Sequence, residues 1–282
     1  MTTEKGYHTK PLGRDRRIVA AASAVNREHN AIHLLTEVDI TEPRRLISRH
    51  LDRTGERLSL TGYITTCLAR TLEAFPQFNA FRKGGRLIVL HDVTIGVLVE
   101  REVDGRHIPE PLTIHAANHK DYRQVNDEIR TAQRQHGRHL GTAPGSEWIR
   151  LVPGVLLRMA IRLASRNVKM KKRYGVVAVT AVGMFGKGPM WPVPLTSATV
   201  TVAVGAIASR PLLIEGALRE REHLTLTVSF DHDIVDGAPA ARFVSRFTEA
   251  LSSGDVLRNA VQDVDLRAAE EARSSAARDA DV

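Results

Sequence analysis

The sequence predicts an α/β protein, an α+β two-layer sandwich in which helices cover a mixed sheet. Runs of β-branched and apolar residues alternate with helical patterns along the whole chain. The 282 residues are 43% hydrophobic and 26% charged, which suffices for a sizeable core. No internal repeat or long low-complexity linker divides the chain. We therefore predict one folded domain over residues 13–257, between a flexible N-terminal tail (1–12) and a charged, alanine-rich C-terminal tail (258–282).

The first hundred residues are predicted to contain three helices and three strands. Thr41 and Pro43 indicate a helix start, as cap and first-turn residue. Apolar residues at helical spacing, from Leu60 to Leu72, indicate another helix that ends before Pro76. In chain order the predicted elements are helix 14–30, strand 32–40, helix 41–53, a helix opened by Ser59 or Thr61, and strands 86–90 and 93–99.

The rest of the chain begins with helices and ends rich in strands. Residues 102–112 contain two prolines and are predicted to form a polar loop. The dense basic run 169–174 (KMKKRY) is interpreted as a solvated loop, with docking of phosphates or of an acidic partner as the alternative. The other predicted elements are helix 118–138, a glycine-containing linker 137–146, helix 148–164, strands 175–181, 199–208 and 224–230, and helix 237–251.

Composition excludes several classes of protein. A single cysteine, Cys67, allows no disulfide framework, and its apolar surroundings favour a buried, inert thiol. The histidine pairs His115/His119 and His136/His139 lack the carboxylate that would complete a zinc site, so no metal is expected. The net charge of +8 comes without a nucleic-acid fold signature. No apolar stretch is long enough to span a membrane, and no signal peptide is evident. We expect a cytoplasmic protein that binds neither nucleic acid nor membrane.

One turn stands out as a candidate for chemistry. Residues 230–237 (FDHDIVDG) lie between a strongly β-forming run and a predicted helix. A histidine at a strand end, His232, can project its ring into a cleft. A carboxylate four residues later, Asp236, can pin the turn by pairing with a basic group, and Gly237 permits unusual backbone geometry. An ordinary polar turn is the alternative that the spacing alone leaves open.

The motif His232-x-x-x-Asp236-Gly237 resembles that of the acyltransferase catalytic core of 2-oxo acid dehydrogenase complexes, which shares its fold with chloramphenicol acetyltransferase. The resemblance covers residues 14–255. Further matching segments occur upstream in the family's order: 33–41 (HLLTEVDIT), 58–80 (ending FPQFNA), 92–99 and 180–186 (TAVGMFG).

The resemblance implies a trimer with its active site in a channel between subunits. His232 would be the general base that takes a proton from the thiol of coenzyme A or of a dihydrolipoyl group, so that the thiolate attacks an acyl thioester. Imidazole suits this role because its reference pKa, about 6.5, is near working pH. Thr180 stands where the family carries a serine whose hydroxyl stabilises the oxyanion. Asp236 would be structural and would pair with a basic residue near the N-terminus: Arg14, Arg16 or Arg17.

The chain departs from the family in three ways. No lipoyl domain or peripheral subunit-binding domain precedes the core, so a lipoyl group would arrive on a separate protein. Asp233 follows the motif histidine, where the family usually has arginine, and places negative charge beside the base. Residues 148–174 are also longer and more basic than expected. We interpret the chain as a divergent, stand-alone member.

The sequence therefore predicts a CoA-dependent acyltransferase that uses acyl-CoA and a thiol acceptor. Its expected partners are further copies, as a homotrimer or a multiple of trimers, and lipoyl-carrier or dehydrogenase subunits. Two alternatives remain open: the same site could acylate a hydroxyl or amine of a small molecule, or the chain could be a non-catalytic trimeric scaffold. The intact His232, Asp236 and Thr180 argue against the scaffold.

Overall fold

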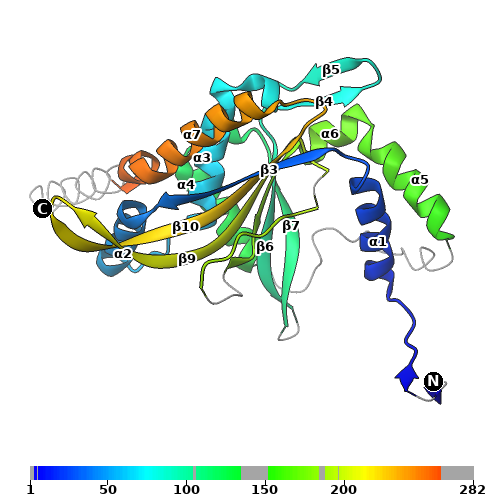
Figure 1. The fold of residues 1–282 in the computed structure, drawn as a ribbon, viewed down its shortest axis with the longest axis horizontal. Helices are drawn as coiled ribbons and strands as arrows, with labels where there is room; N and C mark the ends of the chain where they lie inside the picture. Colours follow the sequence, from blue (N-terminus) through cyan, green and yellow to red (C-terminus); the bar gives the residue numbers. More distant parts are fainter. Residues whose placement is uncertain are drawn as a thin grey trace, which may run out of the picture.

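A six-stranded mixed sheet forms the centre of the computed structural model (Figure 1). The structure describes residues 3–4, 6–103, 106–134, 152–183, 188–195 and 197–261. Only the shortest strand of this sheet runs parallel to its two neighbours, and all the other pairs are antiparallel. The strands, in their order across the sheet, are β3 (Ala31–Asp39), β10 (Ala217–Asp231), β9 (Val200–Ile214), β8 (Val177–Ala181), β6 (Ile95–Val103) and β7 (Arg106–Ile114).

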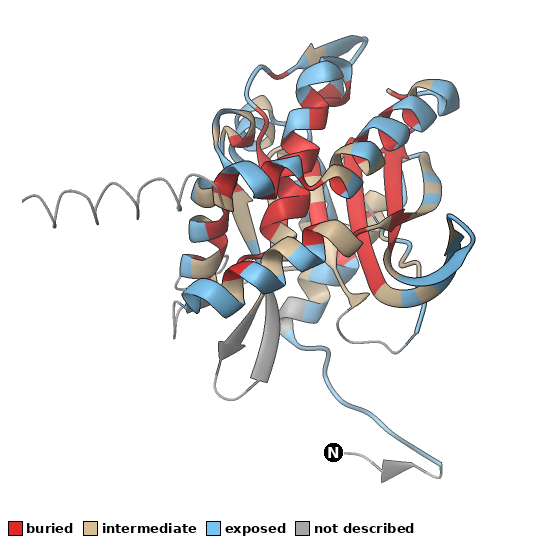
Figure 2. Ribbon diagram, turned by 90° about the vertical axis from the view of Figure 1, so that its left-hand side faces the viewer, coloured by how far each residue is buried: buried red, intermediate tan, exposed pale blue. Residues whose placement is uncertain are grey.

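Helices cover one face of this sheet, and the predicted α/β class is confirmed (Figures 1 and 2). Three phenylalanine rings, Phe78, Phe230 and Phe243, lie within 6 Å of one another where the helices meet β10. Burial of such apolar surface is the main force that holds the two layers together. The covering helices are α2 (Thr41–Thr54), α3 (Leu60–Ala74), α4 (Tyr122–Arg134) and α7 (Gly237–Ser253).

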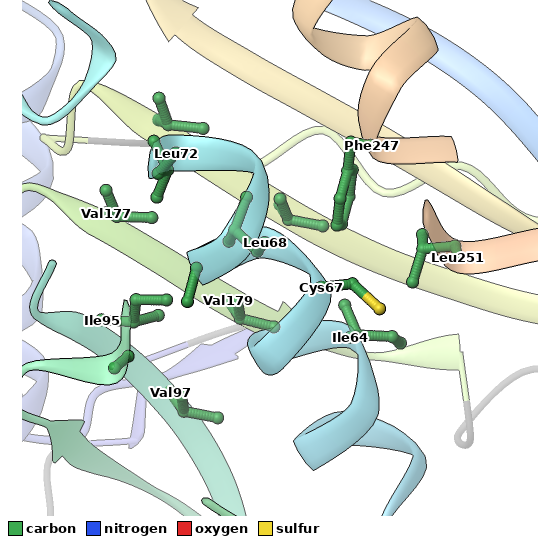
Figure 3. Packing of buried hydrophobic residues seen from close by; sticks show 14 of the residues in the cluster. Ile64, Cys67, Leu68, Leu72, Ile95, Val97, Val177, Val179, Phe247 and Leu251 are labelled. Atoms are coloured by element: carbon green, nitrogen blue, oxygen red, sulfur yellow. The ribbon is translucent and has the colours of Figure 1, made fainter. Parts of the chain in front are cut away.

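The central helix of this layer is α3, and its sequence explains its place. Ser59 caps its first turn, accepting a hydrogen bond from the amide of Gly62 at 3.1 Å. Ile64, Leu68 and Leu72 recur at helical spacing and are buried against the strands, as the close view in Figure 3 shows. The predicted helix is therefore confirmed.

Cys67, on the same helix, is fully buried, and burial raises the pKa of its thiol to about 12. We expect the native chain to resist a thiol-specific reagent at pH 8, since the thiolate is the reacting form. The chain unfolded in urea should react at once, which provides the control. Labelling of the folded chain at the rate of the unfolded one would show that Cys67 is not buried in solution.

Two segments predicted to be loops are regular elements. Residues 106–114 form β7 despite Pro109 and Pro111, because β7 is the edge strand and a proline there removes no hydrogen bond from the sheet interior. The basic run forms helix α6 (Val168–Tyr174), whose first turn is capped by the Asn167 side chain. Both predictions were wrong because they relied on local composition, the prolines in one segment and the clustered charge in the other, without the tertiary context.

Three smaller differences concern pairing and ends. Strand β5 (Arg86–Val89) pairs with β4 (Ala80–Lys83), which was not predicted, rather than continuing into β6. Thr41 is the first residue of α2 and not its cap, because its hydroxyl donates to Asp39 at 2.6 Å. The predicted N-terminal tail contains a two-stranded hairpin of β1 (Thr3–Glu4) with β2 (Tyr7–His8). The predicted linker 137–146 lies outside the described residues.

Helices α1 (Arg14–Asn26) and α5 (Gly154–Ser165) lie side by side at one end of the sheet (Figure 1). Arg162 of α5 forms an ion pair with Glu28, just after α1. At the other end of the pair Arg17 donates to the carbonyl of Val152 at 2.6 Å. These contacts place the C-terminal end of α5 near the start of β3. Among the helices in the described ranges, none has the length and apolar character that crossing a bilayer requires.

Candidate active site

The turn that carries His232 leaves the end of β10 and leads into α7. The backbone anchors it firmly: the amide of His232 donates to the carbonyl of Asn30 at 2.7 Å, and the amides of Ile234 and Val235 both donate to the carbonyl of Asp231. The side chain of His232 itself is exposed. A rigid turn with an exposed imidazole is what a general base at a strand end requires.

Asp231, the last residue of β10, is buried and held from two sides. Nδ1 of His29 lies 3.1 Å from one carboxylate oxygen, and the amide of Asp233 donates to the other at 3.1 Å. Burial alone would raise the pKa of Asp231, but these hydrogen bonds and the nearby charge of Lys171 outweigh it and lower the pKa. The carboxylate that precedes His232 is therefore ionised near neutral pH.

Asp233 lies on the other side of His232 and is neutralised locally. Arg82, from the β4–β5 hairpin, forms an ion pair with it at 3.2 Å, and the Asn30 side-chain amide donates to it at 3.0 Å. The negative charge of Asp233 beside His232 is thus paired with the guanidinium of Arg82. His29, Asn30 and Arg82 were not singled out from the sequence. The only signal for the first two is that they directly precede the strand that pairs with β10.

Asp236 is the residue before α7 and is exposed. Among the described side chains it forms no ion pair, and Arg17 donates to Val152 instead. The side chain of Arg14 lies outside the described residues. Within this chain the N-terminal segment holds the turn through His29 and Asn30, which follow α1.

Because Asp236 is exposed, its replacement should change the free energy of unfolding only slightly. Breaking a buried ion pair costs about 3–5 kcal/mol. A carboxylate at a helix N-terminus contributes only about 0.3–1 kcal/mol through the helix dipole. We therefore expect Asp236→Asn to lower the free energy of unfolding by less than about 1 kcal/mol, measured by urea titration. A loss of several kcal/mol would indicate that Asp236 has a buried partner in the assembled protein.

Thr180 lies on β8, away from the His232 turn. Its neighbour Val179 points into the core beneath α3 (Figure 3), so Thr180 faces the side of the sheet that the helices leave uncovered. Thr180 pairs with Ala203 of β9, which in turn pairs with Thr227 of β10. Just beyond β8, Gly183 lies against the carbonyl of Gly205, where any side chain would collide. The rest of the predicted segment, 184–186, lies outside the described residues.

This register separates Thr180 from His232 within one chain. Thr227 and His232 are five positions apart, or about 17 Å along the strand, and β8 lies two strand spacings, about 10 Å, from β10. The two α-carbons are thus about 20 Å apart, beyond the reach of both side chains. A single copy does not bring the two predicted catalytic groups together.

With this geometry established, comparison with known proteins identifies the family. The family model described as 2-oxoacid dehydrogenases acyltransferase (catalytic domain) matches residues 4–142 and 161–257. The match contains Thr180, His232 and Asp236 and covers most of the chain. The chain belongs to this family, and the resemblance derived from the sequence is confirmed.

Individual relatives are distant. The lipoamide acyltransferase component of the branched-chain alpha-keto acid dehydrogenase complex of Pseudomonas putida is 26% identical over 242 residues, covering 83% of this chain and 49% of the relative. The dihydrolipoyllysine-residue acetyltransferase component of the pyruvate dehydrogenase complex of Staphylococcus aureus is 22% identical over 257 residues, with coverages of 88% and 52%. The chain thus spans about half the length of these curated relatives.

A solved structure shares the fold. The crystal structure of a probable dihydrolipoamide acetyltransferase from Listeria monocytogenes superimposes with a TM-score of 0.65, at 20% identity. The superposition covers 89% of this chain and 96% of that one. At this identity the likeness concerns the arrangement of helices and strands.

Proposed function

We propose that this chain transfers an acyl group between a coenzyme A thioester and a thiol acceptor, with a dihydrolipoyl group on a separate protein as the leading acceptor. The observation that carries the proposal is the His232 turn: an exposed imidazole on a rigidly anchored turn, inside a domain of an acyltransferase family. Proposed partners are further copies of the chain, lipoyl-carrier proteins and dehydrogenase subunits. No metal takes part in the proposed chemistry.

The proposed reaction starts at the imidazole of His232. Its neutral form accepts the proton of the acceptor thiol, and the resulting thiolate attacks the carbonyl carbon of the acyl-CoA thioester. The tetrahedral intermediate expels the coenzyme A thiolate, which recovers the proton from His232. One thioester bond breaks and another forms, so that the enzyme returns to its initial state without an external oxidant or reductant.

Thr180 is proposed to donate its hydroxyl hydrogen bond to the oxyanion of that intermediate. Because Thr180 and His232 of one chain lie about 20 Å apart, the donor would come from a second copy. The half-buried Thr180 lies on the sheet face that the helices leave uncovered, which is open to such a copy. We therefore propose that each site is completed between neighbouring copies in a trimer or a multiple of trimers.

A turnover assay with a set of acyl-CoAs and free dihydrolipoamide tests the proposed function. The expected result is release of free coenzyme A together with S-acyl dihydrolipoamide, lost in the His232→Ala variant. Release of coenzyme A only in the presence of a hydroxyl or amine acceptor would show that the acceptor is not a thiol. Absence of turnover with every acceptor would favour a scaffold and overturn the proposal.

A further inference from the structure

A cavity of about 470 Å³ lies directly beside the His232 turn. Both residues that flank His232, Asp231 and Asp233, are part of its wall. The other walls come from the end of α1, the β4–β5 hairpin, the last turn of α5 and the basic helix α6. The cavity therefore adjoins the turn that carries His232, whose own side chain is not among the lining residues.

Every acidic group in the wall already has a partner. Glu28 is paired with Arg162, Asp231 with His29, and Asp233 with Arg82. Glu28 and Asp233 are thus each paired with an arginine, whereas Asp231 contacts the His29 ring and also lies near the charge of Lys171. Any further cation in the wall therefore lies near carboxylates that already contact another side chain.

The wall contains three such cations: Lys83, Arg166 and Lys171. Across the described part of the chain none of the three forms an ion pair. Lys83 comes from the β4–β5 hairpin, Arg166 from the end of α5 and Lys171 from α6, so three separate elements direct positive charge at one space. Convergent unpaired cations in a concave site attract and hold an anion.

Lys171 is the most informative of the three. It is the half-buried member of the basic run, whereas its neighbour Lys172 is exposed. Its ammonium donates to the carbonyl of Ser197 at 3.2 Å. Burial lowers the pKa of Lys171, and the attraction of Asp231, whose carboxylate is already hydrogen-bonded, offsets this only in part. An ammonium that is removed from water with so little compensation gains from an incoming anion.

The residues that line the cavity all lie within the segments that match the family model. Residues 143–160 lie outside the matched segments, and they include the greater part of α5. The C-terminal end of α5 carries both Arg162, which pairs with Glu28, and Arg166, which forms no ion pair with any residue that the structure describes.

We propose that the cavity is an anion subsite for the substrate, in which Lys171, Arg166 and Lys83 receive a phosphate or carboxylate group. The inference rests on the proposed function, since the anion would belong to a molecule that reaches His232. Two sources supply this chemistry: the phosphates of coenzyme A, or a carboxylate at the far end of a dicarboxylic acyl group. The basic run of the sequence thus contributes one residue to the site and leaves the others to solvent.

The test compares Lys171→Met with Lys172→Met, which removes the same charge from the exposed face of the same helix. Calorimetry measures binding of coenzyme A and of 3′-dephospho-coenzyme A without any turnover. Steady-state kinetics compare succinyl and acetyl thioesters of pantetheine, which differ in the acyl carboxylate and lack the nucleotide. Melting curves of both variants establish that they fold.

For a phosphate, Lys171→Met should reduce the preference for coenzyme A over its dephospho form by about tenfold or more. For an acyl carboxylate, it should reduce the preference of kcat/KM for succinyl over acetyl pantetheine by a similar factor. Lys172→Met should keep both preferences. If Lys171→Met and Lys172→Met show the same preferences with every probe, the proposed subsite is wrong, whether or not the chain turns over thioesters. If the parent chain turns over no thioester yet Lys171→Met weakens coenzyme A binding, the proposed function fails and the subsite stands.

Discussion

The His232→Ala variant is expected to transfer acyl groups about 10²–10⁴-fold more slowly than the parent chain, the usual contribution of a positioned acid–base group. In the proposed mechanism the imidazole accepts the thiol proton, so without it the thiolate must form in bulk solvent. Both neighbouring carboxylates are engaged, Asp231 with His29 and Asp233 with Arg82, so neither is free to replace it. The effect should appear in turnover measured at saturating acyl-CoA.

The same variant should fold normally. The ring of His232 is exposed, and the turn is held by backbone hydrogen bonds that alanine preserves. His115→Ala, at another exposed histidine, is the matched control and should retain full turnover. Parent-like turnover of a folded His232→Ala chain would remove His232 from the mechanism.

The second large effect is expected at Thr180. Thr180→Val keeps the shape of the side chain but removes the hydroxyl, and loss of one oxyanion donor typically lowers turnover about 10²–10³-fold. Thr180→Ser keeps the hydroxyl and should remain active. Because the charge exists only in the transition state, kcat should fall while KM changes little. Equal turnover of the valine and serine variants would show that another group stabilises the oxyanion.

Local patterns were sufficient for the elements that bury one continuous face. The spacing of Ile64, Leu68 and Leu72 predicts α3, and the β-branched run before His232 predicts the core of β10. The strand ends were underestimated: β9 and β10 continue into an exposed ribbon around residues 210–221. Exposed apolar side chains there, such as Leu213 and Leu218, break the alternation of buried apolar and exposed polar residues. Strand β7 was missed because its prolines are tolerated only at an edge, and an edge is a property of the whole sheet.

The candidate site likewise combines residues that local motifs predict with residues that only the fold brings together. His232 and Thr180 could be chosen from short motifs, because each motif is local. The groups that hold the turn, His29, Asn30 and Arg82, are distant in sequence and reach it only through the pairing of β3 with β10 and the position of the β4–β5 hairpin. Likewise, the separation of Thr180 from His232 depends on strand register, which no motif reveals.

The central claim, a site formed by His232 of one copy and Thr180 of another, is tested most directly by mixing two impaired variants. His232→Ala and Thr180→Val chains carrying different tags are co-expressed, and assemblies that contain both are purified through the two tags. In a cyclic trimer of this kind, one site in three combines an intact His232 from one variant with an intact Thr180 from the other. The account predicts that turnover of the mixed assembly rises well above that of either parent. Turnover that stays at the level of the separate variants would contradict it, since His232 and Thr180 would then not meet between copies.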